Sequence, residues 1–428
     1  MQNQPNKIPK VNTLAQCLTL PNGTQIKNRL VKSSMSEALG TAECSPTSEL
    51  TRLYKRWADG GIGLSITGNV MIDRRALGEP GNVVIEDDRD MDALRQWAQA
   101  ATSNGTQCWV QLNHPGKQSP RGMNEETVSP SAVAFTSDMK GHFAVPRELR
   151  DEEIRSLIHR YGVSAALVKQ AGFSGVQIHG AHGYLVGQFL SSLHNLRTDN
   201  WGGSPENRRR FVMEVYRSIR DAVGPGFPVG IKLNSADFQR GGFTEEESLN
   251  VIRALAEAGI DLIEISGGTY ESPAMTGVEV DAQPVKESTR LREAYFLDFA
   301  EKARKAVKTP LVLTGGFRTV TGMHQAIDSG AVDMVGLARI LAMEPDVPQR
   351  LLAGQEAMHC VKPIQTGIKS IDKLGILEVT WYTSQLKRIG KGLPPKPRES
   401  ALWAFIKLAW HLTLISKKKR TPMRHRAS

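Results

Sequence analysis

Residues 229–268 read VGIKLNSADFQRGGFTEEESLNVIRALAEAGIDLIEISGG, and they carry the pattern that decides the fold. The stretch begins with a short apolar run (229–234) and ends with another (261–268), and each run closes on polar or glycine residues. Between them, TEEESLNVIRALAEAG places apolar residues three and four apart and ends in glycine, which is typical of an amphipathic helix with a glycine stop. A strand, a helix and a second strand in this order indicate a right-handed parallel crossover.

The same unit recurs along the chain. Apolar runs of this kind, separated by helical segments, occur at residues 29–35, 63–69, 107–113, 175–180, 229–234, 261–268, 310–316 and 332–339. Eight such units close into a (β/α)8 barrel, so we predict an α/β protein with the TIM-barrel fold. An open doubly wound sheet is the competing arrangement, but no G-x-G-x-x-G follows the first run to support it.

Charge and cysteine content exclude several functional classes. The net charge of +10 lies almost entirely at one end: residues 355–428 hold 15 Lys or Arg against 4 Asp or Glu, which leaves 39 against 40 before them. The body of the protein is therefore neutral, which argues against a nucleic-acid-binding surface there. The four cysteines are scattered without a C-x-x-C pair, which argues against a disulfide framework or an iron–sulfur centre. The first 20 residues show no secretory signal, so we expect a cytoplasmic protein.

The predicted strands end in polar residues, and in a barrel the chemistry lies on the loops at this carboxyl-terminal face. The last two strands end in T-G-G and G-L-A-R, which combine closely approachable glycine amides with an arginine. This pair of sequences predicts a phosphate site. The other strand ends offer Ser33 to Ser36, Gly68, Gln111, His179 with His182 and Tyr184, Lys232, and Ser266.

The segment IHGAHGYL (178–185) has two imidazoles three residues apart and a phenol two residues beyond. Gly180 and Gly183 would each cost a helix roughly 1 kcal/mol, so we expect a loop that presents side chains. An H-x-x-H pair can also bind a metal, but no third ligand stands nearby at a motif spacing, so we predict no metal site. Core histidines bonded to the backbone are the other alternative.

Over residues 12–355 the chain resembles the Old Yellow Enzyme family of FMN-dependent NAD(P)H:flavin oxidoreductases, or ene-reductases. The most specific block is IHGAHGYLVGQFLSSLHNLRTDNWGGSPENRRRF. The resemblance implies one non-covalent FMN on the carboxyl-terminal face of the barrel, reduced by NADH or NADPH. It also implies hydride transfer to the activated C=C bond of an α,β-unsaturated carbonyl or nitro compound. A dehydrogenase or demethylase on the same barrel, or a flavin-binding protein without catalysis, are the alternatives.

The resemblance also implies roles for individual residues. His179 and His182 would hold the oxygen of the substrate, and Tyr184 would deliver the proton. The residues that it assigns to FMN are Ser36, Gly68, Gln111, Lys232, Gly315, Gly316, Ala338 and Arg339. In VKSSMSE (31–37), several relatives have a proline before the methionine and a Cys or Thr at the position of Ser36, so the potential of the flavin is expected to differ.

Beyond residue 355 the resemblance fades. We expect residues 1–355 to form the FMN-binding barrel and 356–428 to form a basic, helical extension with a linker at LPPKPRES (393–400). Residues 401–415 are mostly apolar, too few to span a membrane, and stand before the basic run 417–420. We weigh a helix lying on an anionic membrane against a helix docked on the barrel or a partner subunit, such as a second copy in a homo-oligomer, and place a nucleic-acid tail last.

Overall fold

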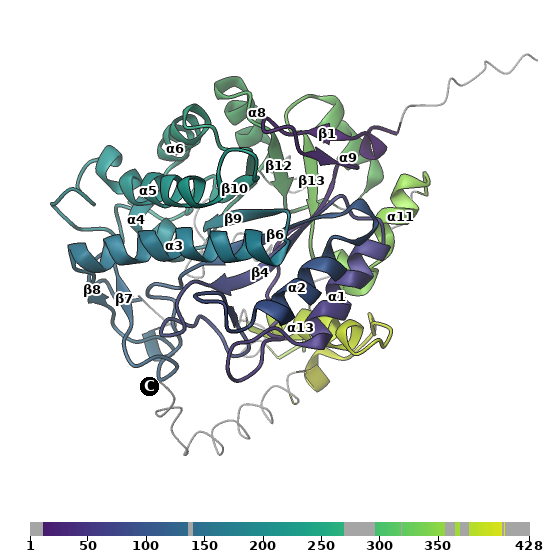
Figure 1. The fold of residues 1–428 in the computed structure, drawn as a ribbon, viewed down its shortest axis with the longest axis horizontal. Coiled ribbons are helices and arrows are strands. Elements are labelled where there is room, and N and C mark those ends of the chain that lie inside the picture. Colours follow the sequence, from purple (N-terminus) through teal and green to yellow (C-terminus); the bar gives the residue numbers. More distant parts are fainter. Residues whose placement is uncertain are drawn as a thin grey trace, which may run out of the picture.

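A computed structural model describes residues 12–135, 140–268, 296–317, 319–355, 364–368, 376–404 and 406. Its centre is a closed ring of parallel strands, because the last barrel strand pairs with the first as well as with its predecessor (Figure 1). The predicted (β/α)8 barrel is thereby confirmed. In ring order the strands are β3 (Leu30–Lys32), β4 (Leu64–Met71), β6 (Gln107–Asn113), β9 (Gly175–Gly180), β10 (Val229–Asn234), β11 (Leu262–Ser266), β12 (Leu311–Thr314) and β13 (Met334–Leu337).

Amphipathic helices surround the strands, and their ends follow sequence signals (Figure 1). Thr244 and Glu247 form a capping box at the start of α6 (Glu245–Glu257), and Pro205 opens α5 (Pro205–Val223). Gly172 ends α3 (Asp151–Ala171) in the left-handed region, with φ of 93°. The remaining outer helices are α1 (Ser48–Asp59), α2 (Met91–Ala101), α8 (Leu297–Ala306), α9 (Val320–Asp328), α10 (Arg339–Met343) and α11 (Val347–Leu352).

Short elements complete the two ends of the barrel. The antiparallel pair β1 (Leu18–Thr19) and β2 (Gln25–Ile26) contributes Leu18 and Ile26 to a buried cluster with Trp109 of β6. Loops on the opposite side contain β5 (Val83–Val84), β7 (Val128–Ser129), β8 (Arg147–Glu148) and α4 (Leu185–Leu190), and two 3-10 turns lie at Thr13–Ala15 and Ser103–Gly105. The buried cluster closes the barrel opposite the loops that carry the predicted site residues.

Trp109 sets the packing inside the barrel. It is fully buried, and a Cβ atom on Gly175 or Gly230 would approach its indole to 2.6 and 2.8 Å. Both β9, which pairs with β6, and β10, the next strand in the ring, therefore need glycine where they face this side chain. Towards the carboxyl ends of the same strands, the inward positions become polar, as described below.

A helix from beyond residue 355 packs on the barrel. In α13 (Ile376–Gly390), Trp381 and Leu386 are buried, and the helix lies against α1 and α10 (Figure 1). Arg52 of α1 donates its Nε hydrogen to the carbonyl of Gly390 at 2.7 Å. Within the described ranges, no helix is both long enough and apolar enough to cross a bilayer.

Candidate active site at the carboxyl ends of the strands

His179, His182 and Tyr184 lie together where β9 ends. The ring centroid of His179 is 5.3 Å from that of His182 and 4.7 Å from that of Tyr184. His182 adopts the left-handed backbone conformation, with φ of 61°, which is uncommon outside glycine. Its N–H donates to Asn234 Oδ1 at 3.2 Å, so the end of β10 holds this strained turn in place. The glycine-rich segment is thus a loop that presents the three rings as a group.

Both imidazoles are held in the neutral form. Burial first, then His182 and Lys232, lower the pKa of His179 well below its ordinary value. Burial and Lys232 do the same to the pKa of His182. Nδ1 of His179 accepts a hydrogen bond from the N–H of Ala181 at 3.3 Å, which places the proton of a neutral ring on Nε2. His179 is therefore oriented as a hydrogen-bond donor at neutral pH.

Two asparagines support the phenol. Asn69 of β4 donates from Nδ2 to the hydroxyl oxygen of Tyr184 at 3.2 Å, and Asn113 of β6 donates to Asn69 Oδ1 at 3.2 Å. Because the phenol is the acceptor in its bond with Asn69, that bond does not consume the phenolic proton. The sequence analysis assigned no role to Asn69, although its place directly after Gly68 at the carboxyl half of a barrel strand was a usable signal.

A chain of polar side chains crosses the inside of the barrel beneath these rings. Gln111 Nε2 donates to Gln177 Oε1 at 2.7 Å, and Gln177 Nε2 donates to Glu264 at 2.8 Å. At the two ends of the chain, Ser34 donates to Gln111 Oε1, and Thr314 donates to Glu264, both at 2.7 Å. The chain therefore links the segment after β3 with β6, β9, β11 and β12, and it includes the predicted cofactor residue Gln111.

Lys232, a second predicted cofactor residue, is paired. Its Nζ lies 3.1 Å from Oε1 of Glu264, which is fully buried. Burial raises the pKa of Glu264, but Lys232 and the donors around the carboxylate outweigh it and hold the pKa below its ordinary value. Lys232 therefore shares its charge with a carboxylate instead of offering an isolated cation to a ligand.

Gly68 is buried where the pairing register between β4 and β6 shifts, and its amide is already bonded. Its N–H donates to Glu37 at 2.9 Å and to the hydroxyl of Tyr54 at 3.2 Å. Lys32 donates to the same carboxylate at 3.3 Å and to the carbonyl of Ile66 at 2.7 Å. A backbone bond from the Gly68 amide to a flavin would therefore compete with Glu37.

The predicted phosphate end lies after β12 and β13. Gly315 and Gly316 have φ of 111° and 89°, a backbone conformation that favours glycine. Ala338 caps α10, and Arg339 is the first residue of that helix. Arg339 donates to Glu378 of α13 at 3.4 Å, a contact that the sequence analysis missed because α13 comes from beyond the region of resemblance.

Ser36, past the end of β3, is the remaining predicted cofactor residue. Its hydroxyl donates to the carboxylate of Glu79, and its carbonyl accepts a bond from Thr383 of α13 at 3.3 Å. Neither partner was singled out from the sequence. Both are distant from Ser36 in the chain, and no sequence motif indicates that they contact it.

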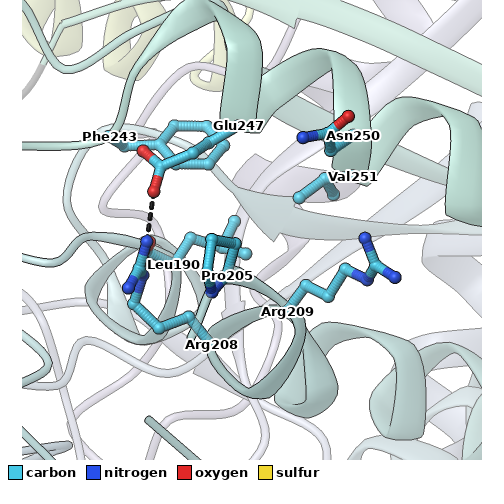
Figure 2. A pocket seen from close by; sticks show the side chains of 8 residues that line it. All are labelled: Leu190, Pro205, Arg208, Arg209, Phe243, Glu247, Asn250 and Val251. Carbon is cyan, nitrogen blue, oxygen red and sulfur yellow. Dashed lines mark hydrogen bonds and ion pairs between the residues drawn. The ribbon is translucent and has the colours of Figure 1, made fainter. Parts of the chain in front are cut away.

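A separate small cavity lies between α5 and α6 (Figure 2). It measures about 10 Å³, no more than one water molecule occupies, and Arg208 spans it to reach Glu247. Arg208 also donates to the carbonyl of Leu190 at 3.2 Å, at the end of α4. Arg208 therefore links the end of α4 to α6, and none of the predicted site residues lines the cavity.

The comparisons with known proteins agree with one another. Residues 14–357 match the model of the NADH:flavin oxidoreductase / NADH oxidase family. An NADH-dependent flavin oxidoreductase of Hypocrea jecorina (strain QM6a) is 37% identical over 363 residues, covering 79% of this chain and 88% of the relative. Another from Neonectria sp. (strain DH2) is 36% identical over 371 residues, covering 82% of this chain but only 48% of that longer relative. The structure of an Old Yellow Enzyme homologue from Zymomonas mobilis superposes with a TM-score of 0.69 at 26% identity, covering 82% of this chain and 95% of that one.

Neutral His179 and His182 give stability a pH dependence. In the unfolded chain an imidazole titrates near pH 6.5, whereas in the folded protein both pKa values lie well below that. The unfolded state therefore binds more protons below about pH 6.5, and the free energy of unfolding falls by up to about 1.4 kcal/mol per pH unit for each ring. We expect urea unfolding to show this loss between about pH 7 and pH 5.

The double variant His179→Asn/His182→Asn should lose less stability over the same range. His142→Asn, at an exposed position, is the matched control and should follow the wild type. His114, whose pKa burial lowers to about 4, contributes the same kind of loss in every variant. An unchanged pH dependence in the double variant would show that the folded protein does not hold the pair neutral.

Proposed function

The chain belongs to the NADH:flavin oxidoreductase / NADH oxidase family, and from this we propose that it is an FMN-dependent ene-reductase. NADH or NADPH is the electron donor, and the acceptor is the activated C=C bond of an α,β-unsaturated carbonyl or nitro compound. The observation that carries the proposal is the group formed by His179, His182 and Tyr184 at the end of β9. FMN, when bound, supplies the hydride chemistry, and the protein must supply the rest.

The two imidazoles suit the oxygen of the acceptor. Reduction at the β-carbon of an enone builds negative charge on the carbonyl oxygen, and donors aimed at this oxygen stabilise the enolate-like transition state. His179 is a neutral ring whose Nδ1 is bonded, so Nε2–H is the donor that it can offer. Because both rings are neutral, they do not balance the flavin's own charge. Two imidazolium ions beside Lys232 would balance it.

Tyr184 is proposed as the acid that protonates the α-carbon. A phenol with an ordinary pKa near 10 keeps its proton at neutral pH and can still release it to a developing carbanion. Asn69 fixes the position of the hydroxyl by donating to its oxygen. The bond between Asn113 and Asn69 extends this support to β6.

The residues around the strand ends fit the cofactor. Gly315, Gly316, Ala338 and Arg339 would hold the phosphate, since bare glycine amides and a guanidinium suit a dianion. Gln111 and Lys232 stand at the polar layer and would hold the polar edge of the ring system. Ser36 and Gly68 would lie beside it. The amide of Gly68 is committed to Glu37, so we assign it the weakest part in binding.

FMN affinity tests the phosphate assignment. We expect the purified protein to be yellow and to release FMN, not FAD, on denaturation. Arg339→Ala should raise the Kd for FMN about 10- to 100-fold, because a hydrogen bond to a charged group contributes about 1.5–3 kcal/mol. Fluorescence quenching on titration with FMN measures this. Arg350→Ala, which removes an arginine paired with Glu344 on the neighbouring helix, should leave the Kd unchanged.

Transient kinetics test the reaction itself. Tyr184→Phe should slow oxidation of the reduced enzyme by an enone about 10²- to 10⁴-fold, since that step needs a proton at carbon. Reduction by NADH or NADPH should be nearly unchanged, because that half-reaction needs no proton at carbon. Anaerobic stopped-flow absorbance of the flavin follows the two half-reactions separately.

Tyr216→Phe on the outer helix α5 is the matched control, since its hydroxyl donates to the carbonyl of Ala258 and accepts from Arg220, neither of which is a predicted site residue. The pair His179→Ala/His182→Ala should weaken binding of phenols to the oxidised flavoprotein as well as turnover. Equal losses in both half-reactions of Tyr184→Phe would contradict its role as the proton donor.

We also propose the division into a cofactor-binding barrel (1–355) and an extension (356–428) that reaches an anionic membrane surface. Residues 407–428, which carry the basic run, lie outside the described residues. Among the described ones, Leu402, Trp403 and Ile406 are exposed and Ala404 is buried. An exposed tryptophan before a lysine-rich run suits the headgroup boundary, where each basic residue contributes about 1 kcal/mol.

Co-sedimentation with vesicles tests this proposal. We expect the full chain to bind phosphatidylserine-containing vesicles in a salt-sensitive way and to ignore phosphatidylcholine vesicles. A chain ending at Glu399 should lose vesicle binding and stay active. It keeps the bonds from Trp381 and Gln385 to Glu399, which hold α13 to the segment after it. Loss of flavin from the shortened chain would show that residues after 399 serve the fold instead.

A further inference from the structure

The side chain of Ser36 has a titratable partner. Its hydroxyl donates to Oε1 of Glu79, and Asn82 Nδ2 donates to the same oxygen at 3.3 Å. Asn82 Oδ1 in turn accepts from the N–H groups of Gly78 and Glu79, at 3.0 and 2.9 Å. The loop after β4 is therefore folded around one asparagine so that the carboxylate faces Ser36.

Charged groups from two other elements face this carboxylate. Glu37, in the segment after β3, and Lys387, in α13, both interact with it electrostatically. Burial raises the pKa of Glu79, the bond from Ser36 opposes this, and Glu37 adds to the rise. Asn82 and Lys387 make smaller contributions that lower it. The pKa of the Glu79 carboxyl group is thus raised above its ordinary value.

The direction of the Ser36 hydroxyl depends on the charge of Glu79. A serine hydroxyl has one hydrogen to donate. While Glu79 is ionised, it accepts that hydrogen, and Ser36 can offer only lone pairs to a third group. Once Glu79 is protonated, its own O–H can donate to Ser36 Oγ, and the hydroxyl hydrogen can turn to another acceptor. The same protonation also removes a negative charge from beside Ser36.

We propose that Glu79 is a positioning residue that sets the hydrogen-bond direction of Ser36 and couples reduction of the flavin to uptake of one proton from solvent. The electrons come from the nicotinamide, and Glu79 takes a proton and no electrons. Helix α13 takes part through Lys387 and through the bond from Thr383 to the carbonyl of Ser36. This inference rests on the proposed function, because it requires FMN beside Ser36.

The reduction potential of the holoenzyme as a function of pH tests the proposal. A carboxylate near a group that gains electrons lowers its potential, so the wild type should show a break in the plot as Glu79 titrates. Glu79→Gln should lack this break and should have a more positive potential on its alkaline side, while matching the wild type on its acid side. In a Ser36→Ala background the effect of Glu79→Gln should shrink, since the serine transmits part of it.

Lys387 offers a second variant that keeps Glu79. Lys387→Met removes a positive charge that lowers the pKa of the carboxyl, so the break should move to higher pH. Lys391→Met, at the exposed residue directly after the end of α13, is the matched control and should leave the break in place.

The possible outcomes distinguish a failure of this inference from a failure of the proposed ene-reductase function. Parallel plots for the wild type, Glu79→Gln and Lys387→Met, all with FMN bound, would overturn the role of Glu79 and leave the ene-reductase proposal standing. A wild type that binds no FMN would overturn both.

Discussion

The carboxylate of Glu264, fully buried inside the barrel, needs every donor that surrounds it. An unpaired charge at this depth would cost several kcal/mol, and Lys232, Gln177 and Thr314 together supply the compensation. Their orientation then propagates. Gln177 uses its amide nitrogen on Glu264, so its oxygen must accept from Gln111, whose own oxygen accepts from Ser34. One carboxylate thereby fixes the direction of each amide in the layer, and each amide keeps a further hydrogen or lone pair that a ligand can use.

The same layer explains how far the sequence could be interpreted. Apolar runs and glycine stops predict the barrel well. The spacing of apolar residues and the positions of glycine are local properties of the sequence, and tertiary contacts reinforce them here. All eight predicted strands are present. Three match the predicted ranges to the residue, and the ends of the other five differ by one to three residues. Residues at strand ends, such as His179 and Lys232, could be found because topology brings all strand ends to one face. Partners such as Glu79 and Glu378 could not, since each is defined by a contact between distant segments and by no spacing.

Helix α13 is the clearest case of this limit. The family model ends at residue 357, and nothing in the sequence of residues 376–390 indicates which surface of the barrel they contact. In the structure, however, Glu378 contacts Arg339, Thr383 contacts Ser36, and Lys387 faces Glu79. These three residues are four or five positions apart, so they lie on one face of the helix. This face points both towards the phosphate end of the proposed cofactor site and towards the segments that carry Ser36 and Glu79. A segment outside the family pattern can therefore adjust a site whose own residues follow it.

Two carboxylates at the same end of the barrel behave in opposite ways, and their partners explain why. Glu264 lies beside three hydrogen-bond donors, one of which is an ammonium group. Together they hold its pKa below the ordinary value in spite of complete burial. Glu79 has neutral donors at hydrogen-bond distance and a second carboxylate, Glu37, nearby, while Lys387 acts only from further away, so burial prevails and its pKa rises. A permanently ionised group suits a scaffold, because its hydrogen bonds never change direction. A group that can gain a proton suits the edge of a redox cofactor, whose charge changes in every turnover.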